Sequence, residues 1–491
     1  MRVQARHLRS RMGDLFWGLV PVAATVALAS VVLASQVVSP HHRIIKAGVM
    51  LVALIIMLRF EMLYSLYFFV FLFPFPSGML VTSTNILLMT LLTLLWAVRA
   101  NSAGMRLFAR TEIDKLVILF TVAYLLSFLN VEQNSDLIEG VKIVWRQLTA
   151  FAFFYLIVNF VTDEKKLNGI IRVVSASAGF LVLTALIEIG APGVTLIPGW
   201  IKTGQRLGQG ELGYRLESLR VGGAVASHGL LSDYCTISIF FMAFLFFRAR
   251  NPIEKLIWAL TTMGTFVVLL ATANRGAFFG LVIGFVYFLY VFRSRFNLVR
   301  YVIVISAMLS FFLGAQLLLD KYTLAASVTQ RMLGTQFEGL VPDSRVGVWE
   351  VPLRRSLEHI FVGHGPYFGI TPGLERMFWP HNAYIYYLFT LGLLGLASFL
   401  MIVYRVAKTS FLHGHPAARG TFAGSVMGIL HVQLLIFLFE QLRTDHQRNT
   451  DFVYIYIVWM LFGLIVATGK LIRARANALA SETAAKDTPG P

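Results

Sequence analysis

Residues 344–395 read SRVGVWEVPLRRSLEHIFVGHGPYFGITPGLERMFWPHNAYIYYLFTLGLLG. The segment begins as a polar loop that glycine and proline interrupt and that carries four arginines. After Pro380-His381-Asn382 it passes into an apolar helix of leucine, tyrosine and small residues. A polar loop of this size that leads into a membrane-type helix usually has a function of its own. The segment therefore predicts a membrane fold and marks the place where its chemistry lies.

The whole chain is as apolar as this helix. Hydrophobic residues make up 57% of it and charged residues 14%, and the mean hydropathy is +0.72. This composition excludes a soluble globule and predicts an all-α polytopic membrane protein. The single cysteine, Cys235, excludes an internal disulfide and a cysteine-based zinc site. We assign the net charge of +17 to membrane orientation and expect no nucleic-acid partner.

Apolar runs of membrane-spanning length recur along the chain. We predict spans near residues 15–35, 43–60, 62–75, 79–98, 116–130, 147–161, 167–190, 227–247, 255–273, 276–292, 299–319, 382–404, 421–440 and 451–469. Two of these runs, 62–75 and 116–130, are short enough to be re-entrant. The prediction is therefore about 12 to 14 transmembrane helices, with short helices in the long loop before residue 382.

The predicted spans divide the chain into four parts. N-terminal helices and a first long loop occupy residues 1–226, and a core occupies 227–405 and includes the loop 320–380. C-terminal helices occupy 406–472, and residues 473–491 form a tail whose end we expect to be disordered.

Lysine and arginine in the short loops indicate the orientation of these spans. The basic stretches 99–115, 293–300 and 470–475 all fall on one side, which the positive-inside rule makes cytoplasmic. Both termini are then cytoplasmic. The two long loops, 191–226 and 320–380, face outward together with the turn 273–276.

Three residues on this outward side can act on a phosphate-bearing substrate. Arg275 opens a helix, whose N-terminus suits an anion, or it snorkels to the interface. Arg345 can bind a diphosphate with both arms of its guanidinium, or pair with Asp343 or Glu350. His381 begins the helix 382–404, where the helix dipole favours a neutral imidazole and a general base, or it is a capping residue.

Other polar residues have weaker claims. Glu188 and His228 lie near outer span ends and can border an active cavity, whereas we expect Asp233 and His431 to pair with neighbouring helices. His364 and Tyr367 can line an acceptor groove or form a turn, and Arg354 is a further candidate for the acceptor cavity. We find no Asp-x-Asp pair, no HExxH and no nucleotide-binding glycine loop, so we expect no metal and no cofactor.

These pieces form an ordered series. It consists of TANRG at 272–276, Ser344-Arg345 with Trp349, Gly363-His364-Gly365, and Pro380-His381-Asn382 ahead of Gly392 and Gly395. Over about residues 227–405 the series resembles the O-antigen ligase and Wzy polymerase superfamily of bacterial envelope proteins. The resemblance implies a GT-C-like, metal-independent and inverting glycosyltransferase of the bacterial inner membrane, with its active site in the periplasm.

The resemblance also implies substrates and roles. The donor would be a glycan on undecaprenyl diphosphate, and the acceptor a saccharide on lipid A-core or on a growing chain. Arg275 and Arg345 would bind the diphosphate, and His381 would deprotonate the acceptor hydroxyl. A chain-length regulator or another polysaccharide assembly protein would be a partner, besides membrane lipids.

Ligase and polymerase remain open. The predicted spans exceed the twelve of the ligases. The polymerase branch carries an arginine followed eleven positions later by glycine in each of two loops, and Arg354 with Gly365 fits this pattern once. A flippase for lipid-linked glycans is the alternative class, although few charges lie within the spans. A non-catalytic scaffold of an assembly complex is the third.

Overall fold

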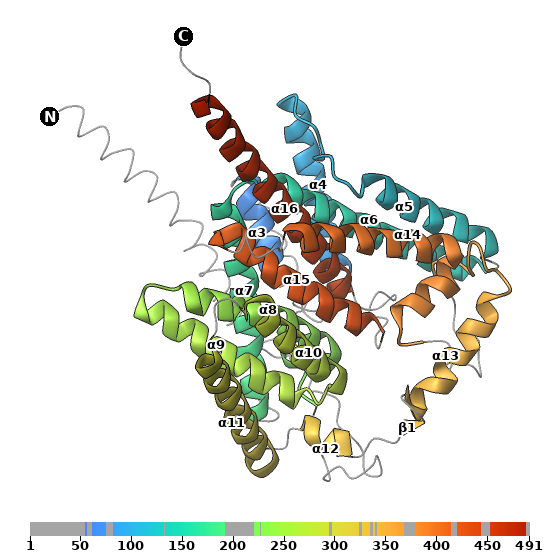
Figure 1. The fold of residues 1–491 in the computed structure, drawn as a ribbon. Helices are drawn as coiled ribbons and strands as arrows, with labels where there is room; N and C mark the ends of the chain where they lie inside the picture. Colours follow the sequence, from blue (N-terminus) through green and yellow to red (C-terminus); the bar gives the residue numbers. More distant parts are fainter. Residues whose placement is uncertain are drawn as a thin grey trace.

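The computed structural model describes residue 55 and residues 61–74, 82–131, 133–191, 220–225, 227–293, 297–323, 327–333, 337–338, 341–367, 380–413, 420–442 and 452–487. Nearly all of this part of the chain is helical (Figure 1). Within it, 8 helices are long and apolar enough to cross a membrane, and shorter apolar helices accompany them. The predicted all-α polytopic architecture is confirmed. The predicted span 15–35, and 43–60 apart from residue 55, lie outside the described residues.

Every predicted span from residue 62 onward coincides with a helix. These are α3 (Met62–Leu72), α4 (Thr82–Ser102), α5 (Asp114–Ser127), α6 (Asn134–Phe160), α7 (Glu164–Gly190), α8 (His228–Arg248), α9 (Pro252–Ala271), α10 (Arg275–Val291), α11 (Leu298–Tyr322), α14 (Ala383–His413), α15 (Phe422–Gln441) and α16 (Phe452–Asp487).

Helix α16 corrects one expectation about the tail. Residues 481–487, which we expected to be disordered, continue the helix to Asp487. The sequence before them, ANALA at 476–480, is rich in alanine, the residue with the highest helix propensity. Figure 1 shows this end of α16 projecting beyond the neighbouring helices.

Polar side chains cap the N-termini of α8 and α10, two helices that contribute to the candidate active site. Ser227 caps α8 by accepting from the Leu230 N–H, and Asn274 caps α10 by accepting from the Ala277 N–H. Each cap satisfies a backbone donor that the first helical turn leaves open. The turn between α9 and α10 is therefore short and stable.

Two closely packed helix pairs contribute to the core of the bundle. Helix α10 packs along α15, and glycines of α10 allow the approach, since a β-carbon at Gly284 would lie 2.3 Å from Cδ1 of Ile436. Helix α6 packs along α16 through large rings, including Phe151 against Trp459 at 4.6 Å between centroids.

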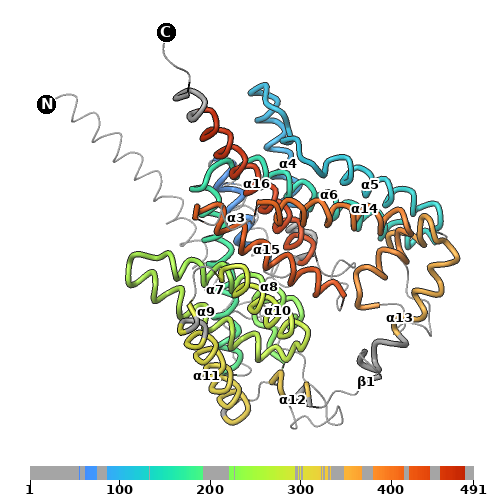
Figure 2. Tube along the Cα trace, in the orientation of Figure 1, coloured from blue at the N-terminus to red at the C-terminus, as the bar shows by residue number. Residues whose placement is uncertain are grey.

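The loop before α14 contains the short helices that we predicted. They are α12 (Val328–Leu333) and α13 (Asp343–Ser356). A two-stranded antiparallel hairpin, β1 (Phe337–Glu338) and β2 (Val341–Pro342), precedes α13 and was not predicted. Figure 2 shows α13 beside the beginning of α14.

Helix α14 is broken, whereas we predicted a continuous helix over 382–404. Gly392 has φ 66° and ψ −166°, so two helical pieces meet there. The segment 360–365 packs its backbone onto the break: Leu393 N–H donates to Ile360 O at 2.7 Å and His364 N–H donates to Phe389 O at 3.0 Å. Inside a membrane protein, backbone groups freed by a helix break need such partners.

Candidate active site

The turn that joins α9 to α10 holds the first predicted site residue. Ala273 has φ 50°, which turns the chain sharply, and Arg275 is the first residue of α10. The Asn274 amide donates to Ser232 Oγ at 2.6 Å, which ties the turn to the first turns of α8. His228, predicted to border the cavity, is the first residue of α8. The start of α8 and the start of α10 are therefore held together.

Arg220 packs against the turn between α9 and α10. It was not among the site residues predicted from the sequence. Its Nε donates to Thr272 O at 3.3 Å, and the neighbouring Val221 N–H donates to Ala271 O at 3.3 Å. The side chain is only 6% exposed. Arg220 and Arg275 together give this turn two positive charges.

Glu188 at the end of α7 holds the segment that carries Arg220. Its Oε2 accepts from the Gly223 N–H at 2.7 Å and from the Gly222 N–H at 3.2 Å. Thr184 Oγ1 accepts from the Ala224 N–H at 3.0 Å. Glu188 is 2% exposed, so the structure gives this carboxylate a positioning contact with the backbone. Its assignment as a cavity residue stays a prediction.

His381 is exposed, but its backbone is fixed on both sides. It has φ 46° and immediately precedes Asn382, whose Oδ1 accepts from the Tyr384 and Ile385 N–H groups at 3.0 and 3.2 Å. Asn382 is therefore the capping residue of α14. On the other side, the Trp349 indole donates to Pro380 O at 2.6 Å. The imidazole is thus carried by a loop whose backbone is held by hydrogen bonds on both sides.

The end of α15 is a common neighbour of the Arg275 helix and the His381 loop. Asn382 Nδ2 donates to Leu442 O at 3.2 Å. Two residues earlier, Glu440 faces α10, because a β-carbon at Gly280 would lie 3.5 Å from Glu440 Oε1. The Tyr454 hydroxyl donates to Glu440 Oε2 at 3.4 Å. We call this end of the bundle, where α10 and α14 begin and α15 ends, the site end.

Helix α13 carries the predicted Arg345, whose place at the site end stays a prediction. Arg345 lies in the first turn of α13, and its side chain is outside the described part of the chain. Trp349 follows four residues later on the same helical face, and it contacts the His381 loop through Pro380. Arg354, near the other end of α13, is exposed.

His364 is packed inside the segment 360–365, which covers the break in α14. Its ring stacks on Phe389 with 4.6 Å between centroids, and Nε2 lies 2.9 Å from Arg355 O. Burial lowers the pKa of His364 and so favours the neutral ring. The neighbouring Tyr367 is half-buried, and burial is also the main cause of its raised pKa. Their assignment to an acceptor groove stays a prediction.

The remaining two polar residues lie within the spans. His431 bonds to two other helices: its Nε2 lies 2.7 Å from the Tyr287 hydroxyl of α10 and its Nδ1 lies 2.7 Å from Ser410 Oγ of α14. The prediction that His431 pairs with neighbouring helices is confirmed. Asp233 is fully buried in α8.

Residues 258–400 match a sequence model of the O-antigen ligase family. The expected resemblance is confirmed for this segment. This O-antigen ligase-like segment runs from α9 into the second piece of α14, and it contains Arg275, Arg345 and His381. Arg220 and Glu188 lie before it. A comparison with curated proteins finds no match. The chain is therefore a multi-pass membrane protein with an O-antigen ligase-like segment over residues 258–400.

Proposed function

We propose that this protein is an inner-membrane glycosyltransferase of the O-antigen ligase or polymerase type. It moves a glycan from undecaprenyl diphosphate to a saccharide acceptor on the periplasmic side. The observation that carries the proposal is that α10, which Arg275 begins beside the buried Arg220, and the loop with the exposed His381 both contact the end of α15.

The two arginines bind the diphosphate of the donor. Guanidinium groups hold phosphate oxygens through pairs of charge-assisted hydrogen bonds, and the N-terminus of α10 adds free N–H groups and its positive dipole end. Arg345 adds a third cation from α13. Negative charge grows on the diphosphate as the glycosidic bond breaks, so these cations stabilise the transition state more than the bound donor.

His381 is the general base. Its imidazole takes the proton from an acceptor hydroxyl, and that oxygen forms the new bond to the anomeric carbon of the donor. The bond between this carbon and the diphosphate oxygen breaks, and the lipid diphosphate leaves with the electron pair. A single displacement of this kind inverts the anomeric centre. Arginines supply the leaving-group stabilisation, so no step requires a metal.

A deletion strain tests the proposal and separates its two branches. Surface glycan that consists of single repeats on lipid A-core indicates a polymerase, and accumulated lipid-linked polymer indicates a ligase. Unchanged surface glycan with no accumulated intermediate would contradict the proposal. A polymerase would further be expected to act with a chain-length regulator.

Lysine in place of either arginine is expected to weaken donor binding. R220K and R275K keep the charge but lose the paired hydrogen bonds of the guanidinium. We expect the KM for the lipid-linked donor to rise about tenfold in each variant, because one charge-assisted hydrogen bond contributes about 1.5–3 kcal/mol. R250K, at an exposed position just beyond the end of α8 that lies away from the site end, serves as the matched control and should behave as wild type. A donor KM unchanged in both R220K and R275K would argue against diphosphate binding here.

Glu188 is expected to act through Arg220. E188Q keeps an oxygen that accepts from the Gly222 and Gly223 N–H groups, so its donor KM should stay within about twofold of wild type. E188L leaves both buried N–H groups without that acceptor, so its donor KM should rise while turnover at saturating donor changes less. Equal loss of activity in E188Q and E188L would show that the charge itself is needed, and that positioning is not the role.

A further inference from the structure

The loop that carries His381 is attached to a helix of the preceding loop, α13. The indole Nε1–H of Trp349 donates to Pro380 O at 2.6 Å, and the two residues lie 31 positions apart in the sequence. Pro380 immediately precedes His381. The backbone next to the proposed base is therefore bonded to a side chain of another helix.

The conformation of His381 shows why this attachment matters. Its φ of 46° lies in the left-handed region, which is unfavourable for a residue with a side chain. Such conformations persist where surrounding contacts fix the backbone, and they cluster at functional sites. On the C-terminal side, Asn382 fixes the backbone through its bonds to the Tyr384 and Ile385 N–H groups. On the N-terminal side, Trp349 does so.

Helix α13 is itself fixed along the piece of α14 that precedes the break (Figure 2). Near the end of α13, the Arg355 carbonyl lies 2.9 Å from Nε2 of His364. The His364 ring stacks on Phe389 with 4.6 Å between centroids. Trp349 therefore reaches Pro380 from a helix whose far end is anchored near the break. A hydrogen-bond donor on a fixed helix can hold its acceptor in one place.

We propose that Trp349 is a positioning residue for the general base. Its N–H holds the Pro380 carbonyl, which keeps the backbone of His381 in the left-handed conformation and the imidazole within reach of the acceptor hydroxyl. The inference rests on the proposed function, since it takes His381 to be the base. A misplacement of about 1 Å can cost a reaction about a hundredfold in rate, so one hydrogen bond beside the base can decide turnover.

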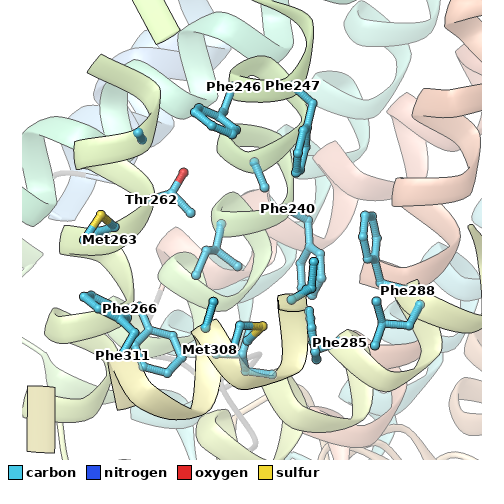
Figure 3. Close-up of a pocket in the computed structure, with 17 residues that line it drawn as sticks. Phe240, Phe246, Phe247, Thr262, Met263, Phe266, Phe285, Phe288, Met308 and Phe311 are labelled. Carbon is cyan, nitrogen blue, oxygen red and sulfur yellow. The ribbon is translucent and has the colours of Figure 1, made fainter. Parts of the chain in front are cut away.

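This contact is separate from the apolar groove between α8, α9, α10 and α11 (Figure 3). Phenylalanine rings line the groove, and its single hydroxyl, that of Thr262, donates to Trp258 O at 2.6 Å. The lining residues belong to these four helices, whereas α13, α14 and α15 hold the His381 loop. Loss of the Trp349 N–H should leave the groove unchanged, so a change in turnover reports on the loop.

Removing the N–H is expected to lower turnover and to leave donor binding nearly unchanged. W349F keeps an aromatic ring without the N–H, and benzothienylalanine in place of Trp349 keeps the bicyclic shape with sulfur instead of N–H. At saturating substrates we expect kcat to fall about 10- to 100-fold in both variants, with the donor KM within about twofold of wild type. W96F is the matched control, because the Trp96 indole donates to Leu107 O, also at 2.6 Å, at the opposite end of the bundle. It should keep wild-type kcat.

A double substitution distinguishes positioning of the base from a general structural effect. In H381G the imidazole is absent and its position no longer matters, so adding W349F should lower kcat by no more than about a further twofold. Additive losses would show that the Trp349 bond acts on something other than the base, and would overturn the proposal. An unchanged kcat in W349F, or an equal fall in W96F, would overturn it as well.

These outcomes are distinct from a failure of the proposed function. If wild-type protein transfers glycan and H381G is impaired while both Trp349 variants are not, the positioning role alone is wrong. If wild-type protein transfers no glycan, or H381G keeps wild-type turnover, the proposed function or its base fails and the inference fails with it. A Tm close to that of wild type shows that each variant is folded.

Discussion

Replacing His381 by glycine is expected to lower kcat about 10²- to 10⁴-fold, the usual contribution of a general base. Glycine adopts the φ of 46° more readily than histidine does, so H381G removes the imidazole without straining the loop. The donor KM should change little, because diphosphate binding belongs to the arginines. Initial rates with purified protein, at saturating donor and acceptor, measure the effect.

His413 provides the control for this experiment. It lies at the opposite end of α14, so H413A removes an imidazole from the same helix but far from the site end. H413A should retain wild-type turnover. Added imidazole should restore part of the activity of H381G. Turnover of H381G above half the wild-type value would rule out the base role.

Alanine at Gly392 is expected to destabilise the protein by roughly 3 kcal/mol or more, among the larger effects of single substitutions. Its β-carbon would lie 2.4 Å from the carbonyl carbon and oxygen of Phe361, and its φ of 66° disfavours any side chain. The segment 360–365 would have to leave the break in α14. We expect little G392A in the membrane and a markedly lower Tm of the purified protein.

Gly314 is the matched control for Gly392. It lies within α11, and nothing is within 4 Å of the β-carbon that alanine would add. Because alanine has a higher helix propensity than glycine, G314A should be as stable as wild type or more stable. A Tm of G392A equal to that of wild type would mean that the α14 break is not fixed by this contact.

Most of the helices were predictable because hydropathy alone decides them. An apolar run of about 20 residues forms a helix in a membrane whatever its neighbours are, since the backbone needs internal hydrogen bonds. The positions of Arg275 and His381 at helix starts were also predictable, because each stands before an apolar run. Residues 481–487 at the end of α16 were predicted to be disordered because they are polar. The alanine-rich sequence before them favours the helix that forms.

The break in α14 and the position of Arg220 both depend on contacts between residues that are far apart in the sequence. Glycine within an apolar helix is common, so Gly392 gives no signal until the segment 360–365 is seen against it. Arg220 lies in a long loop, and nothing nearby in sequence shows that it packs on Thr272, 52 residues later. The backbone contacts of Glu188 gave no signal in the sequence either, because its two N–H donors lie 34 and 35 residues away.

The most direct test is glycan transfer by the purified protein in lipid nanodiscs. The protein receives a synthetic donor, a glycan on undecaprenyl diphosphate, and a saccharide acceptor, and the product is analysed by NMR. We predict a new glycosidic bond with the anomeric configuration opposite to that of the donor, formed in the presence of a metal chelator. No new bond, or a product that retains the donor configuration, would contradict the proposed reaction.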